Sequence, residues 1–389
     1  MLKPRYEGQA LVAYYFFYFC TIGAFLPYWG PWLRSEGQNA LAIGLLTAAV
    51  QFSKVLAPNV WGWLLHYVPT RWLIPGGGLA AALSFLLLFG VGGHFLALLL
   101  TTLLFSFFWA ATLPLVDNIT MAWAAREGRR YGRIRLWGSL GFIALSLGMG
   151  ALLSVYGQRS FLPGIALFLL LAWWVSRFLP FSATPQSTQP QNRADFLPEL
   201  RDPRLWFFLA AGILEQASHG VYYAFYSIYV EAHGYDSVTV GLLWALAVLA
   251  EVLFFWFGDR ILRRWGTAPV FASAFILTAL RWLVIAWWPG FVWIVLVQTL
   301  HAASYAAFHL AAIHWVFARF PQALRARGMA LYASLVYGLG GGIGALAAGW
   351  VWSRWGGSGA FLAAGVLAGA AALLLLGMFR SQSALEKPA

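Results

Sequence analysis

The stretch Asp117–Gly141 reads DNITMAWAAREGRRYGRIRLWGSLG and joins two long apolar runs. Asp117 lies inside the first run, and Arg135 stands where the second run begins. At about 1.5 Å per helical residue, we expect the two side chains at similar depth on neighbouring antiparallel helices. A charged side chain inside a bilayer costs roughly 2.5–3.5 kcal/mol, so we predict that Asp117 pairs with Arg135. The pair could serve function, or it could simply hold two helices together below a positively charged loop.

The composition is that of a helical membrane protein. Of the 389 residues, 61% are hydrophobic and 10% are charged, whereas soluble domains carry about 25% charged residues. The alternation of apolar and polar residues that is typical of an outer-membrane barrel is absent from the sequence. We therefore expect a lipid bilayer as the surroundings of the chain.

Twelve apolar runs are long enough to cross a bilayer, which takes about 20 residues. The runs cover residues 10–32, 40–65, 72–92, 95–124, 133–155, 160–180, 204–231, 238–261, 268–288, 290–318, 328–352 and 358–379. The one long connection, 181–203, is polar and rich in Pro, Gln and Ser, which predicts a cytoplasmic linker. The sequence thus predicts an all-α membrane protein with twelve transmembrane helices, with one six-helix bundle in residues 1–180 and a second in 204–389.

Three pairs of landmarks recur at nearly the same spacing, 192 or 193 residues. They are His66 and Asp259 in the connections after the second and eighth spans, Arg135 and Arg327 at the start of glycine-rich spans, and Asp117 and His309 deep in apolar spans. A constant spacing between unrelated landmarks indicates an internal repeat. We therefore predict two pseudo-symmetric six-helix halves.

The basic residues are distributed unevenly over this topology. Of the 25 lysines and arginines, 20 lie at one face, three lie at the other (Arg34, Arg159 and Arg354) and two, Lys54 and Arg281, lie inside spans. Because basic residues stay on the cytoplasmic side, we expect both termini in the cytoplasm and the protein in the cell's inner (plasma) membrane. The net charge of +12 then orients the protein, and we expect no nucleic-acid partner.

Several kinds of chemistry are missing from the sequence. Cys20 is the one cysteine, so an intramolecular disulfide and a cysteine-based metal site are excluded. No lysine follows a GxxxxG pattern, so there is no Walker phosphate loop, and neither HExxH nor GxSxG occurs. We expect a monomer that is not an enzyme and has no cofactor or metal, in which a gradient or a partner drives the work.

Ionisable residues inside the spans are the candidate site residues, because each costs free energy in a membrane. Glu251, His301 and His309 lie mid-span in the second half, and carboxyl and imidazole groups can relay protons. With Glu215, we interpret them as proton-coupling residues. We interpret as substrate-binding residues Lys54, Asp117, Arg135, His219, Tyr222 and Tyr223.

Each of these residues also has a plainer interpretation. Arg281 lies in the outward half of its span, and we expect its long side chain to extend to the outer interface. A single histidine in a helix can be a packing residue with one hydrogen bond. The glycine-rich spans 133–155 and 328–352 can allow either tight static packing or sliding of helices.

Two connections resemble the loop motif of the major facilitator superfamily: GWLLHYVPTR (62–71), with His66 where an Asp is usual, and FGDRILRRWG (257–266). The run YGRIRLWG (131–138) resembles the start of the fifth helix in lactose-permease-like symporters. In those proteins a carboxylate on helix four and the second arginine of the motif bind the substrate. The resemblance implies these roles for Asp117 and Arg135.

Four further stretches are similar to the phenylpropionate permease branch of this superfamily. They are ASHGVYYAFYSIY (217–229), GLLWALAVLAEV (241–252), the pair Arg281-Trp282, and LHAASYAAFHLAA (300–312). The resemblance implies two six-helix bundles around a central cavity. It also implies proton-coupled uptake of a small organic solute, for example an aromatic carboxylate such as phenylpropionate or cinnamate.

We therefore favour a proton symporter that works by alternating access, with an organic acid bound near the membrane midplane. Lys54 and Arg135 would attract the anion, Asp117 would compete for Arg135, and Glu251 with a histidine would carry the proton. A sugar or nucleoside symporter, a drug-efflux antiporter and a non-transporting sensor are the alternatives. Residues 136–155 contain no proline, which counts against efflux, since efflux proteins of this fold usually carry a Gly-Pro motif there.

Overall fold

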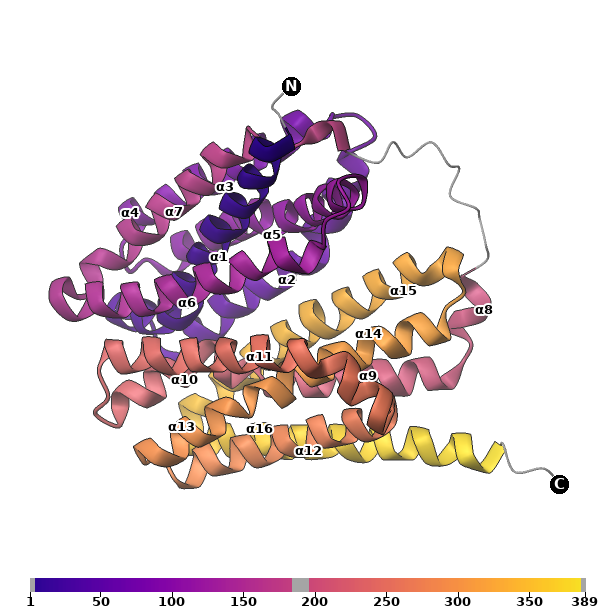
Figure 1. The fold of residues 1–389 in the computed structure, drawn as a ribbon. Helices are drawn as coiled ribbons and strands as arrows, with labels where there is room; N and C mark the ends of the chain where they lie inside the picture. Colours follow the sequence, from indigo (N-terminus) through magenta and orange to yellow (C-terminus); the bar gives the residue numbers. More distant parts are fainter. Residues whose placement is uncertain (1–3, 184–195, 386–389) are drawn as a thin grey trace. The chain divides into compact units, whose positions relative to one another are not determined.

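The computed structural model describes residues 4–183 and 196–385, and every regular element in these ranges is a helix (Figure 1). Residues 184–195 of the predicted linker lie outside the described residues. By its contacts the chain forms two compact units. The first unit is Met1–Thr188 with Ser227–Ala245, and the second unit is Gln189–Tyr226 with Leu246–Ala389. The division into bundles of residues 1–180 and 204–389 stays a prediction.

The helices of the first unit are long and apolar. They are α1 (Pro4–Ser35), α2 (Ala40–Leu64), α3 (Thr70–Leu86), α4 (Leu88–Val91), α5 (Phe95–Arg126), α6 (Tyr131–Tyr156), η1 (Gly157–Ser160), α7 (Phe161–Ser176) and η2 (Phe181–Ala183). Helix α1 packs along α6 and α7, and α5 packs against α2 and α3. A Cβ on Gly141 of α6 would lie 2.2 Å from the backbone oxygen of Phe16 of α1, so glycine is required for this approach.

The remaining helices belong to the second unit, except that parts of α10 and α11 join the first. They are α8 (Leu197–Leu200), α9 (Pro203–Ser218), α10 (Gly220–Ala232), α11 (Ser237–Trp265), α12 (Thr267–Trp287), α13 (Phe291–Thr299), η3 (Ala302–Ala307), α14 (Phe308–Arg319), η4 (Gln322–Leu324), α15 (Arg325–Tyr332), η5 (Ala333–Gly340) and α16 (Gly341–Leu385). Helices α9 and α12 both pack along α16. Gly344 of α16 lies against the backbone of α9, where a Cβ would be 2.3 Å from the oxygen of Ala217.

Within the described residues, nine helical segments are long and apolar enough to cross a membrane. Two of them, Tyr131–Ser176 and Gln322–Leu375, are 46 and 54 residues long, about twice the length that one crossing requires. Each contains a glycine with positive φ, Gly157 or Gly356, at which the helix direction can change. The multi-pass all-α prediction is confirmed, and the count of twelve stays a prediction that these lengths support.

Three irregularities interrupt the helices of the second unit. The helix of residues 203–232 is divided at His219, between α9 and α10. The short segments η3 and η5 are π-helical. Such segments insert an extra residue into a helical turn and occur frequently at functional sites. All three lie close to the polar residues described next.

Candidate functional site

A buried arginine lies at the centre of the polar cluster in the second unit. Arg281 of α12 is 0% exposed. One of its terminal nitrogens donates to Nδ1 of His301 at 2.8 Å and to the hydroxyl of Ser304 at 3.0 Å, and the other donates to Oε1 of Gln298 at 2.7 Å. The expectation that Arg281 extends to the outer interface is therefore wrong. Polar groups from α13 and the start of η3 replace water around its guanidinium group.

Two aromatic rings cover the same guanidinium group. Its carbon lies 4.4 Å from the ring centre of Tyr222 and 4.5 Å from that of Trp282. A desolvated cation over aromatic rings gains about 2 kcal/mol or more. The amide of Gln298 also donates to the hydroxyl of Tyr222 at 3.1 Å. Gln298 escaped prediction, although its position one turn before His301 in an apolar span was a usable signal.

The hydrogen bond from Arg281 determines which nitrogen of His301 carries a hydrogen. Arginine can only donate, so Nδ1 of His301 accepts and the hydrogen of the neutral ring lies on Nε2. Nε2 is 2.8 Å from Oε1 of Glu251, whose side chain is 15% exposed. His301 therefore donates to an acceptor oxygen of Glu251 while it accepts from Arg281. The structure brings together Glu251 and His301, and it adds Arg281, which we had not counted as a site residue.

Glu215 and His219 lie beside this cluster, at the division between α9 and α10. Both are buried, at 0% and 1% exposed. Oε1 of Glu215 is 2.6 Å from the hydroxyl of Thr278, and Nδ1 of His219 is 3.0 Å from the backbone oxygen of Glu215. The ring of His219 lies 6.4 Å from that of His301 and 6.1 Å from that of Tyr223. Glu215, His219, Tyr223 and His301, which were all predicted as site residues, thus share one buried region of the second unit.

His309 lies at the end of a row of stacked rings that begins at His301. Tyr305 stacks between His301 and His309, with ring centres 5.7 Å and 6.0 Å away. Nδ1 of His309 is 2.9 Å from the hydroxyl of Tyr337, which belongs to the π-helical segment η5. The predicted histidine pair therefore lies on one face, and an aromatic ring separates its two members.

In the first unit, Asp117 has hydroxyl partners. It accepts a short hydrogen bond from Tyr15 and one of 2.9 Å from Tyr131. Arg135 instead lies over the ring of Phe19, with its guanidinium carbon 3.9 Å from the ring centre. The predicted ion pair between Asp117 and Arg135 is therefore wrong for this structure. Two phenol groups provide the compensation that we had assigned to a charge.

Two predicted site residues of the first unit, Lys54 and Arg135, differ from Arg281 in their surroundings. Lys54 of α2 is exposed on the isolated chain, and Arg135 is half-buried. Among the ion pairs of residues 6–182 and 196–375, none includes Lys54 or Arg135. The structure thus gives neither cation a carboxylate counter-charge within the described residues.

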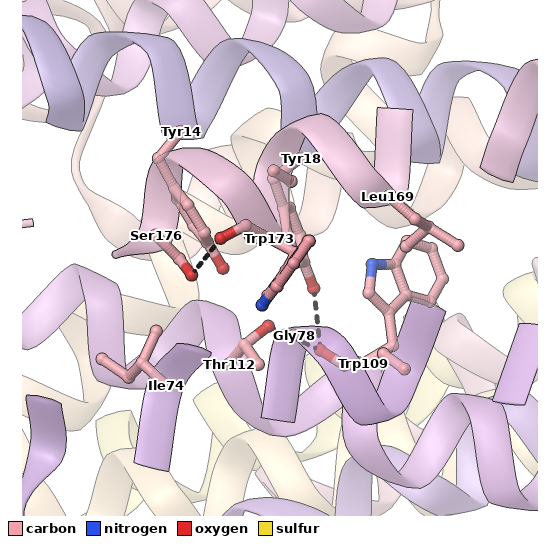
Figure 2. A pocket seen from close by; sticks show the side chains of 11 residues that line it. Tyr14, Tyr18, Ile74, Gly78, Trp109, Thr112, Leu169, Trp173 and Ser176 are labelled. Carbon is pink, nitrogen blue, oxygen red and sulfur yellow. Dashed lines mark hydrogen bonds between the residues drawn. The ribbon is translucent and has the colours of Figure 1, made fainter. Parts of the chain in front are cut away.

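A cavity inside the first unit is too small for an organic substrate. Figure 2 shows it between the phenol groups of Tyr14 and Tyr18 and the hydroxyl groups of Thr112 and Ser176. Its volume is about 20 Å³, and a single water needs about 10–15 Å³. This space suits one water molecule. No group of three or more potential metal ligands occurs in the described residues.

Comparison with known proteins adds a family and a fold. The family model described as MFS_1 like family matches residues 9–363. The probable 3-phenylpropionic acid transporter of Escherichia coli (strain K12) is 33% identical over 321 residues, which cover 78% of this chain and 81% of that protein. The maltose permease of Geobacillus stearothermophilus is 27% identical over 353 residues, which cover 88% of this chain and 87% of that protein.

Solved structures agree with the all-helical architecture. The crystal structure of the nucleoside transporter NupG matches with a TM-score of 0.83 and 18% identity, over 96% of this chain and 99% of that chain. An inward-facing bacterial homologue of the lysosomal transporter Spinster matches with a TM-score of 0.76 and 15% identity, over 97% of both chains. At these identities the likeness shows the fold alone, and it confirms the predicted fold class.

Proposed function

The chain belongs to the MFS_1 like family of transporters, and from this premise we propose that it takes up a small organic anion together with a proton. The family match confirms the predicted superfamily, and the 3-phenylpropionic acid relative confirms the predicted branch. The protein is thus a multi-pass membrane transporter. In our proposal it lies in the inner membrane with both termini in the cytoplasm, because the basic residues gather at one face of the predicted topology.

The observation that carries the proposal is the series of side-chain hydrogen bonds that links Arg281 through His301 to Glu251. A buried cation with one carboxylate as its counter-charge is a costly arrangement in a membrane, which makes it a candidate for function. When Glu251 is ionised, the charges of Arg281 and Glu251 cancel. When a proton from water forms an O–H bond on Glu251, the charge of Arg281 is no longer balanced.

This change in charge couples the proton to an anion. Protonation of Glu251 strengthens the positive field that an organic anion meets. In our proposal Arg135 and Lys54 of the first unit attract the carboxylate of the substrate, since neither has a carboxylate partner in the structure. Release of the anion and return of Glu251 to its ionised form complete the cycle.

The chemical class of the substrate comes from the relative. That protein is named a probable 3-phenylpropionic acid transporter, and an aromatic monocarboxylate is our first choice for this chain. Tyr222 and Tyr223 lie next to the buried cluster, where aromatic rings can stack on the ring of such a substrate. His309, with Tyr337, would extend the proton path from His301.

A sugar or nucleoside is the second candidate. Relatives include a maltose permease, and the NupG structure has the same fold. Asp117 accepts from two phenol groups, and a carboxylate of this kind can equally accept from the hydroxyl groups of a polyol. Under this alternative, Asp117→Asn would abolish uptake of the sugar or nucleoside.

The test is uptake into proteoliposomes that contain the purified protein. We expect radiolabelled 3-phenylpropionate to accumulate when the outside is made acidic, and a protonophore to prevent accumulation. Glu251→Gln should bind the substrate yet lose accumulation. Glu127→Gln, at the start of the α5–α6 connection, is the matched control and should behave as wild type. Full pH-driven accumulation by Glu251→Gln would refute the proposal, and binding without accumulation by the wild type would favour a sensor.

A further inference from the structure

We infer that Glu215, which the sequence suggested as a proton-coupling residue, is instead a carboxylic acid that stays protonated throughout the transport cycle. Glu251 is then the carboxyl group near Arg281 that gains and loses the proton. The inference rests on the proposed function and sharpens it. It predicts that one proton accompanies each substrate anion, and that uptake of a monocarboxylate moves no net charge. The neutral state of Glu215 follows from its surroundings in three steps.

The first step is the burial of the carboxyl group. Glu215 is 0% exposed, and its Oε2 has no hydrogen-bond partner within the described residues. A buried ionised carboxylate with one oxygen that accepts no hydrogen bond from the protein is far more costly than a neutral acid with the same contacts. The surroundings therefore favour the protonated group.

The second step is a count of hydrogens. The hydroxyl of Thr278 lies 2.6 Å from Oε1 of Glu215 and 2.8 Å from the backbone oxygen of Ala274. A hydroxyl has one hydrogen, and the backbone oxygen can only accept. If Thr278 donates to Ala274, the short contact with Glu215 requires a hydrogen on the carboxyl group. A protonated Glu215 that donates to Thr278 satisfies both contacts at once.

The third step is the balance of charge around Arg281. Glu251 already compensates this cation through His301, which is neutral. A second ionised carboxylate would leave the buried cluster with an excess negative charge. A neutral Glu215 keeps the cluster balanced when Glu251 is ionised, and a bound anion restores the balance when Glu251 is protonated.

Among the described residues, the charged group that acts on Glu215 is Arg281 of α12, and His219 uses Nδ1 for the backbone oxygen of Glu215. Helix α9 is packed against η5 and α16 by small and apolar residues, such as Val336 against Gly212 and Gly344 against Ala217. Near Glu251 lie His301 and the phenol groups of Tyr222 and Tyr223.

The transport test uses proteoliposomes, 3-phenylpropionate and a potassium gradient with valinomycin, which sets an inside-negative potential without a pH gradient. We expect no potential-driven accumulation, and we expect Glu215→Gln to keep pH-driven uptake within about twofold of wild type, with an unchanged pH profile, because glutamine imitates the neutral acid. Potential-driven uptake that disappears in Glu215→Gln would overturn the inference while leaving proton coupling intact. Loss of all pH dependence in the wild type would instead reject the proposed function.

A spectroscopic test is independent of the substrate. Infrared spectra of the reconstituted protein should show the carbonyl stretch of a protonated carboxylic acid from mildly acidic to mildly alkaline buffer. The band should be absent from Glu215→Gln and shifted in Thr278→Val, which removes the acceptor of the carboxyl hydrogen. If the wild-type band disappears as the buffer becomes alkaline, or if Thr278→Val leaves it unmoved, the inference is wrong.

Discussion

The two units hold their charged residues in opposite ways. In the second unit, three polar side chains and two rings surround Arg281, and only its Nε has no hydrogen-bond partner in the described residues. In the first unit, Arg135 lies against Phe19 and has no carboxylate partner in the same part of the chain. The positions that match Arg281, Glu251 and His301 at a spacing of 192 residues are apolar or uncharged: Phe89, Asn59 and Trp109. The proposed proton chemistry therefore belongs to one half of an otherwise repeated chain.

The ion pairs at the ends of the helices, in contrast, are similar in the two units. Arg126 at the end of α5 pairs with Glu7 near the start of α1. Arg319 at the end of α14 pairs with Glu199, and it also pairs with Asp202 at 2.9 Å. The two arginines are 193 residues apart and the two glutamates 192. The same repeat spacing thus holds for ion pairs that the sequence had not indicated, which supports the predicted repeat.

The largest contrast should appear when each arginine is removed. Arg281→Leu leaves Gln298, His301 and Glu251 without their buried cation and should destabilise the protein by about 3–5 kcal/mol. Arg135→Leu removes mainly a cation–ring contact and should cost about 0.5–2 kcal/mol. Unfolding titrations of both purified variants in mixed micelles measure the difference. Equal losses of stability would contradict the contrast between an arginine inside a polar network and an arginine that lies against a ring.

The fold was predictable because its signals are long and periodic. Apolar runs of about 20 residues identify membrane helices without any knowledge of contacts, and three landmarks were enough to reveal the repeat. The π-helical segments η3 and η5 were not predicted, because an extra residue in one helical turn leaves no mark on hydrophobicity. The division of the helix at His219, where the backbone amide donates to the carbonyl oxygen of Gln216, also leaves no mark on hydrophobicity.

The partners in the site were harder to predict than its residues. Asp117 and Arg135 both lie near Tyr15, but their predicted depth contains no information on the direction in which a side chain points around its helix. Tyr15, from a distant part of the sequence, takes the place assigned to Arg135. Arg281 was misjudged because the polar groups that make its burial possible come from another helix.

A second contrast concerns the phenol groups that compensate the negative charge of Asp117. Asp117→Ala removes the acceptor for Tyr15 and Tyr131, and unsatisfied buried hydroxyls should cost about 1–3 kcal/mol. Asp117→Asn keeps an acceptor oxygen and should cost less than half as much. If the two variants unfold alike in the same micelle titration, the acceptor oxygen of Asp117 does not contribute to stability through the phenol groups.

The start of the second helix in each predicted repeat offers a smaller, pH-dependent contrast. Asn39 caps α2 by accepting from the amide of Ala42, and Asp236 accepts from the amide of Thr239 at the start of α11. The hydrogen bonds from Thr239 hold the pKa of Asp236 below its ordinary value. This contribution to stability is complete above the unfolded carboxyl pKa of about 3.9, and it is lost as the pH falls through the lower folded value.

Substitution separates the charge of this cap from its shape. Asp236→Ala should cost about 0.5–1 kcal/mol at neutral pH, the lower end for caps because the residue is exposed. Asp236→Asn should retain most of the cap and remove its pH dependence, as at Asn39. Thermal unfolding in detergent, followed from neutral to acidic pH, compares the three proteins. Identical acid sensitivity of Asp236→Asn and wild type would show that other carboxylates dominate.

The smallest expected effects concern the two shared ion pairs, where the units should differ in degree only. Arg319 contacts Glu199 and Asp202 and is 27% exposed, whereas Arg126 contacts Glu7 and Glu127 and is 42% exposed. Partly exposed pairs contribute about 0.2–1 kcal/mol, and lower exposure increases the value because solvent screens the charges less. Double-mutant cycles of Arg319 with Glu199 and of Arg126 with Glu7 should therefore give the larger coupling for Arg319. A larger coupling for Arg126 would mean that the indole of Trp123, which donates to Glu7, has a greater effect than the difference in exposure.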